Sequence, residues 1–231
     1  MSKKVFYEIN KNIDMLFNRG YSNFLDPYIF KHISSKLKKF EYYVFYPYND
    51  SDKVIIYSYK KPLIKLFKIK CNDVLTHSMI LGSLYGLNIS SDMFGDIIVD
   101  GDKYYIYLME DVSTFVLNNL TRIGSKSVQL VEIDSSSLTD YQKKFEDYSS
   151  IVSSLRIDNV ISTITGLSRS KVKEKISNDE VLLNYDVLSN GSYQLKDNDV
   201  FSVRRYGKFK FINVKGTTKK DNYIINYIKY I

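Results

Sequence analysis

Residues 155–177 read LRIDNVISTITGLSRSKVKEKIS, and this stretch decides the fold of the last third of the chain. Its first half predicts a short amphipathic helix that ends at Gly166. The apolar residues at helical spacing are Ile157, Val160, Ile161 and Ile164. Its second half predicts another helix, which begins after the N-cap Ser168 and turns Val172 and Ile176 inward. Two short helices joined by a tight turn therefore open a C-terminal unit.

Short alternating runs after these helices predict a small β-sheet. Turns between the runs are marked by Asn190-Gly191 and by Asp197-Asn198-Asp199. We expect strands at about 181–185, 193–195, 200–203, 208–215 and 222–230. Residues 155–231 are thus predicted to form one unit of two helices and a small sheet.

The preceding residues predict two further small units that also mix helices and strands. Residues 1–71 begin with two helices, the second starting at Asp26-Pro27, an N-cap followed by proline, and continue with two strands. Residues 72–134 have the predicted order α-β-β-α-β, a small sandwich with a hairpin turn at Asp100-Gly101. Residues 135–154 are polar and serine-rich, which indicates a linker or a connecting helix. The fold class is therefore α+β.

The composition of the 231 residues excludes several classes of protein. With 44% hydrophobic and 15% aromatic residues, the chain can bury cores and is not disordered. One cysteine and two histidines argue against a disulfide framework and a Cys/His metal site, so no metal and no cofactor is expected. The longest uncharged stretch, residues 74–91, contains Thr, His, Ser and Asn and is no membrane span. The N-terminal residues lack the apolar core of a signal peptide, and we expect a cytoplasmic protein.

The positive charge of the chain is concentrated in its last third. Residues 1–154 carry 19 basic and 18 acidic side chains, whereas residues 155–231 carry 14 basic and 8 acidic side chains, a net charge of +6. Four of the six arginines lie in the second segment, and arginine grips phosphate with a planar fork of donors. A general lysine bias does not explain this segregation, so the segment is predicted to bind a polyanion. The alternative is a solvated basic face without a partner.

The second predicted helix places cations where an anion also meets backbone amides. The helix dipole favours an anion near the Ser168 cap, and Arg169 and Lys173, four residues apart, share an exposed face. A second basic group surrounds the strand end at Gly207 and consists of Arg204, Arg205 and Lys208. These groups are predicted to follow the sugar-phosphate backbone of structured RNA. The alternative is an ordinary capped helix with solvated lysines.

Residues 155–211 resemble the S-four RNA-binding domain, named after a protein of the small ribosomal subunit. The resemblance is carried by Leu155-Arg156-Ile157-Asp158, Leu167-Ser168-Arg169-Ser170, Val181-Leu182-Leu183-Asn184 and Asp199-Val200-Phe201-Ser202-Val203. In that family a helix pair and a neighbouring strand form the RNA surface. The resemblance implies roles for Arg156, Ser168, Arg169, Lys173 and Asn184. With their neighbours, the predicted RNA-binding set is Arg156, Asp158, Ser168, Arg169, Ser170, Lys171, Lys173, Asn184, Arg204, Arg205 and Lys208.

The whole chain resembles the YlmH family of bacterial S-four proteins. The matching motifs are Asn23-Phe24-Leu25-Asp26-Pro27, then His77, Leu81-Gly82, Leu84, Gly86 and Gly95-Asp96-Ile97, and finally Arg204-Arg205-Tyr206-Gly207-Lys208. The chain departs from the family at Arg205, Lys208, Ser78-Met79 and Ser90. The resemblance implies binding to ribosomal RNA and tRNA on the large ribosomal subunit, in the rescue of stalled translation. Some members are also linked to cell division.

Two other functions stay open on the sequence. S-four domains also occur on RNA-modifying enzymes, so an enzyme with a cryptic site is one alternative. Neither His77 nor Cys71 has a catalytic partner motif nearby, and the hairpin turn accounts for Asp100-Gly101, so we predict no catalytic residue. An adaptor that binds a cell-division protein is the other alternative. The residues therefore favour a non-catalytic RNA-binding protein, and the resemblance implies a role in ribosome-associated quality control.

Overall fold

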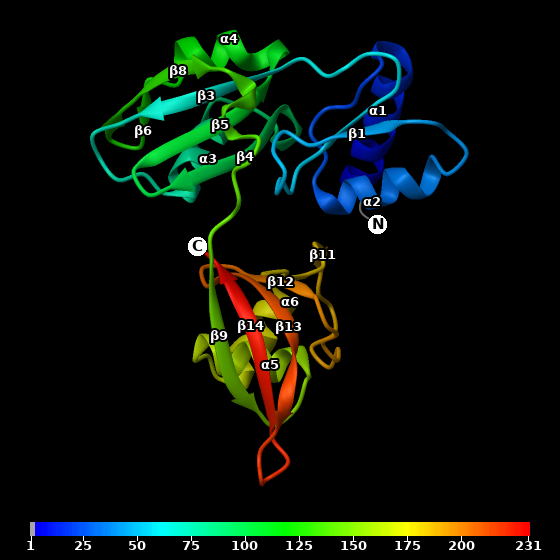
Figure 1. Ribbon diagram of the computed structural model, residues 1–231, viewed down its shortest axis with the longest axis vertical. Helices are drawn as coiled ribbons and strands as arrows, with labels where there is room; N and C mark the ends of the chain where they lie inside the picture. Colours follow the sequence, from blue (N-terminus) through cyan, green and yellow to red (C-terminus); the bar gives the residue numbers. More distant parts are fainter. Residues whose placement is uncertain (1–2) are drawn as a thin grey trace. The chain divides into compact units, whose positions relative to one another are not determined.

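The computed structural model describes residues 3–231 and divides the chain into two compact units, residues 1–142 and residues 143–231 (Figure 1). Both units combine helices with antiparallel sheets, which confirms the predicted α+β class. Within residues 3–231, no helix is long and apolar enough to cross a lipid bilayer.

The first unit begins with two helices that share a core with a two-stranded sheet. These elements are α1 (Lys3–Arg19), α2 (Pro27–Lys36), β1 (Tyr43–Phe45) and β2 (Ile55–Tyr57). The second helix starts as the sequence predicts, because the Asp26 carboxylate accepts a hydrogen bond of 2.8 Å from the Ile29 amide and Pro27 follows the cap. The shared core consists of Ile9, Leu16, Leu25, Ile29, Ile33, Leu37, Val54 and Ile56.

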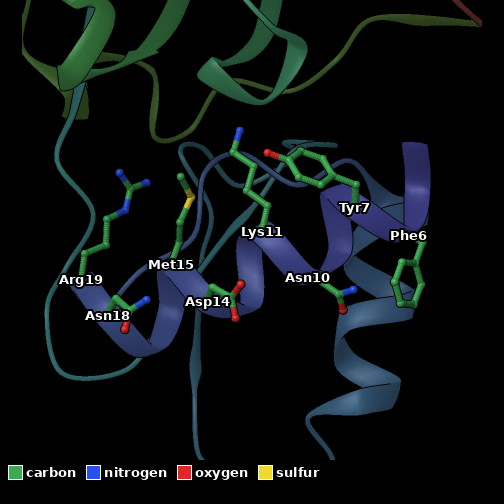
Figure 2. A pocket seen from close by; sticks show the side chains of 8 residues that line it. All are labelled: Phe6, Tyr7, Asn10, Lys11, Asp14, Met15, Asn18 and Arg19. Carbon is green, nitrogen blue, oxygen red and sulfur yellow. The ribbon is translucent and has the colours of Figure 1, made fainter. Parts of the chain in front are cut away.

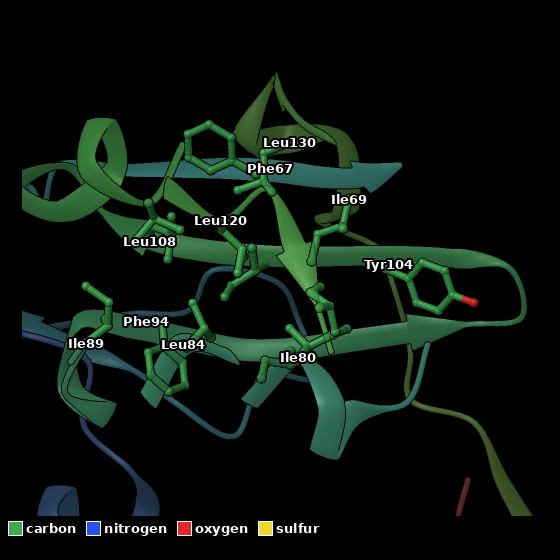
Figure 3. Close-up of a cluster of buried hydrophobic side chains, with 14 of the residues drawn as sticks. Phe67, Ile69, Ile80, Leu84, Ile89, Phe94, Tyr104, Leu108, Leu120 and Leu130 are labelled. Atoms are coloured by element: carbon green, nitrogen blue, oxygen red, sulfur yellow. The ribbon is translucent and has the colours of Figure 1, made fainter. Parts of the chain in front are cut away.

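A four-stranded antiparallel sheet with helices on one face forms the rest of the first unit. Its strands are β3 (Ile64–Lys70), β4 (Phe94–Asp100), β5 (Lys103–Met109) and β8 (Gln129–Ile133), in the order β4-β5-β3-β8. The helices are α3 (His77–Gly86) and α4 (Glu110–Asn119), and the short elements are η1 (Ser91–Met93), β6 (Arg122–Ile123), β7 (Lys126–Ser127) and η2 (Ser135–Leu138). Figure 3 shows the buried cluster between helices and sheet, in which Phe67 and Ile69 of β3 lie with Ile80 and Leu84 of α3.

Strand β3 corrects the predicted boundary between residues 71 and 72. β3 pairs with β5 on one side and with β8 on the other, so it is a central strand of the four-stranded sheet. Leu66 and Phe67 point to opposite faces, and both are buried. A strand that is buried on both faces lacks the simple alternation by which strands are recognised. The order of this sheet unit is therefore β-α-β-β-α-β, with β3 as its first strand.

The second unit is a six-stranded antiparallel sheet with two helices packed on one face (Figure 1). Its elements are β9 (Phe145–Val152), α5 (Ile157–Thr165), α6 (Arg169–Ser177), β10 (Val181–Leu183), β11 (Asp186–Val187), β12 (Val200–Val203), β13 (Gly207–Thr217) and β14 (Tyr223–Tyr230). The sheet order is β11-β10-β12-β13-β14-β9. Both helices lie where the sequence predicts them, and Val172 and Ile176 are buried as expected.

Strand β9 lies inside the segment 135–154, which the sequence analysis interpreted as a linker or a connecting helix. It pairs with β14 along its whole length and forms one edge of the six-stranded sheet. Most of its side chains are exposed, so its composition is that of a polar loop. The compact unit therefore begins at residue 143 instead of residue 155. Residues 193–195, predicted as a strand, contribute a single β-bridge through Gln194.

Two glycines of the first unit give a matched test of this packing. A Cβ atom on Gly95 of β4 would lie 3.0 Å from the ring of Phe24 and 3.1 Å from the Cβ of Tyr107, whereas a Cβ on Gly82 of α3 would meet nothing within 4 Å. We expect Gly95→Ala to destabilise the unit by about 1–3 kcal/mol through overpacking. Gly82→Ala should stabilise it by about 0.5–1 kcal/mol, because alanine favours the helix. Calorimetric melting of both variants checks the prediction, and equal shifts of the melting temperature would contradict it.

Candidate nucleic-acid interface

Helix α6 begins at a tight turn that its sequence specifies. Gly166 ends α5 in the left-handed region, at φ 71°, and Ser168 then caps α6. The Ser168 Oγ accepts a hydrogen bond of 3.4 Å from the Lys171 amide and lies 2.9 Å from the Ser170 Oγ. Arg169 is therefore the first helical residue, in the turn whose amides point out of the helix toward an approaching anion.

The exposed face of α6 carries much of the predicted set. Val172 and Ile176 are buried against the sheet, and the residues between them and the cap are turned to solvent. We call these exposed residues the α6 surface, which consists of Ser168, Arg169, Ser170, Lys171 and Lys173. Three cations thus surround a helix N-terminus, where the dipole itself favours negative charge.

Arg156 and Asp158 are tied to each other. The Arg156 guanidinium donates from Nε to Oδ1 of Asp158 at 3.1 Å and from Nη2 to Oδ2 at 2.7 Å, a bidentate pair. The Asp158 side chain is 2% exposed. The Arg156 hydrogen bonds hold the pKa of the Asp158 carboxyl below its usual range although burial raises it, and Arg169 lowers the same pKa further. The pair stabilises the start of α5, and RNA contacts of these two residues stay a prediction.

Asn184 is a turn residue with internal hydrogen bonds. Its φ is 49°, its Nδ2 donates to Oδ1 of Asp199 at 2.7 Å, and its Oδ1 accepts from the Val200 amide at 3.0 Å. Asp199 is buried and also accepts from the Lys196 amide at 2.8 Å. The Asn184 side chain therefore holds the end of β10 to the start of β12, and its RNA contact stays a prediction.

Arg204 and Arg205 lie at the other end of α6. The Arg204 Nη1 is 3.6 Å from Oε1 of Glu180, and Lys175, in the last turn of α6, donates to Oε2 of the same carboxylate at 2.7 Å. Arg205 is exposed in the turn between β12 and β13, with φ 73°. Since a helix rises 1.5 Å per residue, the two ends of the nine-residue α6 are about 12 Å apart. The structure therefore separates the predicted set into two basic groups, one at each end of α6.

Lys208 lies apart from both groups. Its Nζ donates to Oη of Tyr185 at 3.2 Å and is 5.0 Å and 4.9 Å from the ring centroids of Tyr185 and Tyr230. Phe209, the next residue on β13, belongs to the core beneath the helices, so Lys208 points to the opposite face of the sheet. Its RNA contact also stays a prediction.

A hollow of about 480 Å³ runs along α1 and is lined by eight residues of that helix (Figure 2). One of its cations is part of the fold, because the Lys11 ammonium donates to the buried Asp92 carboxylate at 2.6 Å. Burial raises the pKa of Asp92, but the hydrogen bonds from Lys11, Ser90 and Asn23 outweigh it and hold that pKa below its usual range. Among residues 3–231, no three His, Cys, Asp or Glu side chains are placed to hold a metal ion.

The central strand β5 carries basic and aromatic side chains that were not among the predicted site residues. Strand β5 reads Lys103-Tyr104-Tyr105-Ile106-Tyr107-Leu108, and alternate residues of a strand share a face. Lys103, Tyr105 and Tyr107 therefore lie together on the face opposite the helices. That alternation of a cation and two aromatic residues was the available signal.

Comparison with known proteins relates the chain to RNA-binding and ribosome-associated proteins. Residues 62–137, from β3 to η2, match the family model described as "Putative RNA-binding domain in YlmH". The chain is 31% identical over 151 residues to the ribosome-associated protein quality control protein P2 of Bacillus subtilis (strain 168). That alignment covers 65% of this chain and 59% of the relative. The solved structure of the cell division protein ylmH from Streptococcus pneumoniae is 19% identical, with a TM-score of 0.49, over 61% of this chain and 97% of that chain.

The ion pair at the start of α5 predicts a pH-dependent stability of the second unit. Because Arg156 lowers the pKa of Asp158 in the folded state, its stabilisation is present above about pH 4 and is lost as the pH falls further. Asp158→Asn should lower the melting temperature at pH 7, and the difference from the unmodified protein should shrink toward pH 2.5. Melting curves from pH 2.5 to pH 7 measure this, with Asp197→Asn in an exposed turn as the control. A difference that is constant with pH would contradict the assignment.

Proposed function

Because this chain belongs to the YlmH family, we propose that it is a non-catalytic protein that binds structured RNA on the ribosome. The chain spans 59% of the length of its Bacillus subtilis relative, whose name places that protein in ribosome-associated quality control. We assign the same role to this chain, with ribosomal RNA and tRNA on the large subunit as its partners in the cytoplasm. The second unit then acts as an S-four-type RNA-binding unit.

The observation that carries this proposal is the α6 surface. Residues 143–231 contain 16 basic and 10 acidic side chains, and Arg169, Lys171 and Lys173 are all exposed within the first five residues of α6. Arg156 and Asp158 form an ion pair, whereas the first six residues of α6 carry three cations and one carboxylate, that of Glu174. A phosphate at this position meets helix amides, the helix dipole and an arginine fork together.

The two basic groups at the ends of α6 suit RNA better than a single small anion. The two ends of α6 are about 12 Å apart, which is farther than one phosphate reaches. A sugar-phosphate backbone that follows α6 contacts both groups, with Arg169 at one end and the exposed Arg204 and Arg205 at the other. Such contacts fix the position of the protein on RNA without reading its bases. The shape of a folded RNA then supplies the specificity.

Charge reversal at the α6 surface tests the site. Arg169→Glu with Lys173→Glu removes two attractions and adds two repulsions, and each well-formed charged contact is worth about 1.5–3 kcal/mol. We expect the affinity for a hairpin RNA to fall tenfold or more, with stability changed by no more than about 0.5 kcal/mol because both residues are exposed. Fluorescence anisotropy with a labelled hairpin RNA measures the affinity, and melting curves check the fold.

Lys219→Glu with Lys220→Glu is the matched control, because both lysines are exposed in the turn between β13 and β14 of the same unit. It makes the same change of net charge at a different place. Equal losses from the two double variants would mean that RNA is bound by diffuse charge, and an unchanged affinity of the α6 variant would reject the site. Modified nucleosides in RNA incubated with the pure protein would favour an RNA-modifying enzyme instead.

The salt dependence of binding tests the electrostatic part of the proposal. A protein that neutralises roughly four to six phosphates releases the counterions bound there. The logarithm of the affinity for hairpin RNA should therefore fall with the logarithm of salt concentration at a slope of about −3 to −5. Binding titrations at KCl concentrations from about 50 to 200 mM measure this slope. A slope near zero would contradict binding through the phosphate backbone.

A further inference from the structure

The four-stranded sheet of the first unit has the topology of a base-stacking platform. Its elements run β3-α3-β4-β5-α4-β8, and the sheet order β4-β5-β3-β8 makes β5 and β3 the central strands. This is the split β-α-β arrangement, in which helices cover one face and leave the central strands open on the other. RNA-recognition modules with a four-stranded sheet stack single-stranded bases on aromatic residues of that face.

The sequence of β5 matches the strand that carries those aromatic residues. The general pattern has a basic residue first, aromatic residues at its third, fifth and eighth positions, and an aliphatic residue at its sixth. Here Lys103, Tyr105, Tyr107 and Leu108 hold the first, third, fifth and sixth positions, whereas Glu110 stands at the eighth. The small residues of the pattern are replaced by Tyr104 and Ile106, which face the helices and are buried in their core.

The chain itself covers one half of the face. Tyr107 is fully buried, and the ring of Tyr48 is stacked on it with centroids 6.2 Å apart and planes 17° apart. The Tyr48 hydroxyl donates to the Asp96 carboxylate of β4 at 2.6 Å. Phe24 and Leu66 belong to the same buried cluster. An aromatic ring of the chain thus lies where a nucleobase would stack on Tyr107.

The other half of the face stays accessible and is basic. Tyr105 is half-buried and lies between Ile98 of β4 and Lys68 of β3 in the sheet register. Lys103 and Lys70, at the same end of the two central strands, are exposed. Asp100 is the acidic residue that β4 contributes to this end, where it pairs in register with Lys103. Three lysines around a tyrosine ring therefore combine a stacking surface with cations for phosphates.

We propose that this half of the sheet, centred on Tyr105, binds one or two nucleotides of single-stranded RNA. A base stacks on the Tyr105 ring, and Lys68, Lys70 and Lys103 contact the flanking phosphates. Paired bases do not reach the ring, because stacking on a sheet requires a base that is splayed out of its helix. The inference rests on the proposed RNA-binding function and names, for the region that matches the RNA-binding family model, the kind of RNA and the side chains that bind it.

Substitution of Tyr105 separates this surface from the α6 surface. Tyr105→Leu keeps an apolar side chain but removes the ring, and the affinity for a labelled single-stranded uridine decamer should fall about five- to a hundredfold. Tyr105→Phe keeps the ring and should stay within about twofold, since stacking does not need the hydroxyl. Tyr43→Leu, at an exposed tyrosine on β1, is the control and should leave the affinity unchanged. Melting curves of the full chain report whether each variant is folded.

The two RNA probes distinguish a failure of this inference from a failure of the proposed function. Tyr105→Leu should leave hairpin binding within about twofold, whereas Arg169→Glu with Lys173→Glu should impair hairpin binding and retain most of the decamer affinity. If Tyr105→Leu does not fold, Lys68→Gln with Lys103→Gln replaces it, and we expect about a tenfold loss for the decamer. A folded Tyr105→Leu variant, or that lysine variant, with unchanged decamer affinity would overturn the inference, whatever happens at α6.

Discussion

The hydrogen bond between Tyr48 and Asp96 is the constraint on which the first unit depends. Each antiparallel sheet has two faces, and helices cover only one of them. In the first unit, this bond fastens residues before β2 over half of the second face, and the Asp52 amide donates to the same carboxylate at 2.7 Å. Burial, with the Asp96 carboxylate beside it, raises the pKa of the Tyr48 hydroxyl, so it stays a donor. The Tyr107 hydroxyl also donates to the Pro47 carbonyl at 3.2 Å, and together these contacts hold the segment over one half of the face.

In the second unit, exposed cations lie at both ends of the short helix α6. Buried Val172 and Ile176 fix the rotation of α6, and Ser168 fixes its first turn. Several polar side chains of the predicted set are hydrogen-bonded within the unit. Arg156 donates to Asp158, and Asn184 donates to Asp199. Those contacts shape the unit, and they leave the exposed residues of α6 and of the β12–β13 turn to meet phosphates.

The sequence predicted the elements whose signals are local. Helix α5 with its Gly166 stop, and α6 with its Ser168 cap, needed only apolar spacing and end residues. Strand β3 was not predicted, because it is buried on both faces and lacks a simple alternation. Strand β9 was not predicted either, because its side chains are largely exposed and only its pairing with β14 makes it a strand. The bidentate Arg156–Asp158 contact and the stacking of Tyr48 on Tyr107 depend on tertiary placement, so no local pattern reveals them.

The most direct measurement is ultraviolet crosslinking of the full chain to ribosomes, followed by mass spectrometry of the RNA-linked peptides. We expect crosslinked peptides from two places: the start of α6, at residues 168–173, and the β5 strand that contains Tyr105. Tyr107, which the chain itself covers, should carry no nucleotide. Crosslinks confined to α1 and α2, with none in α6 or β5, would contradict the account.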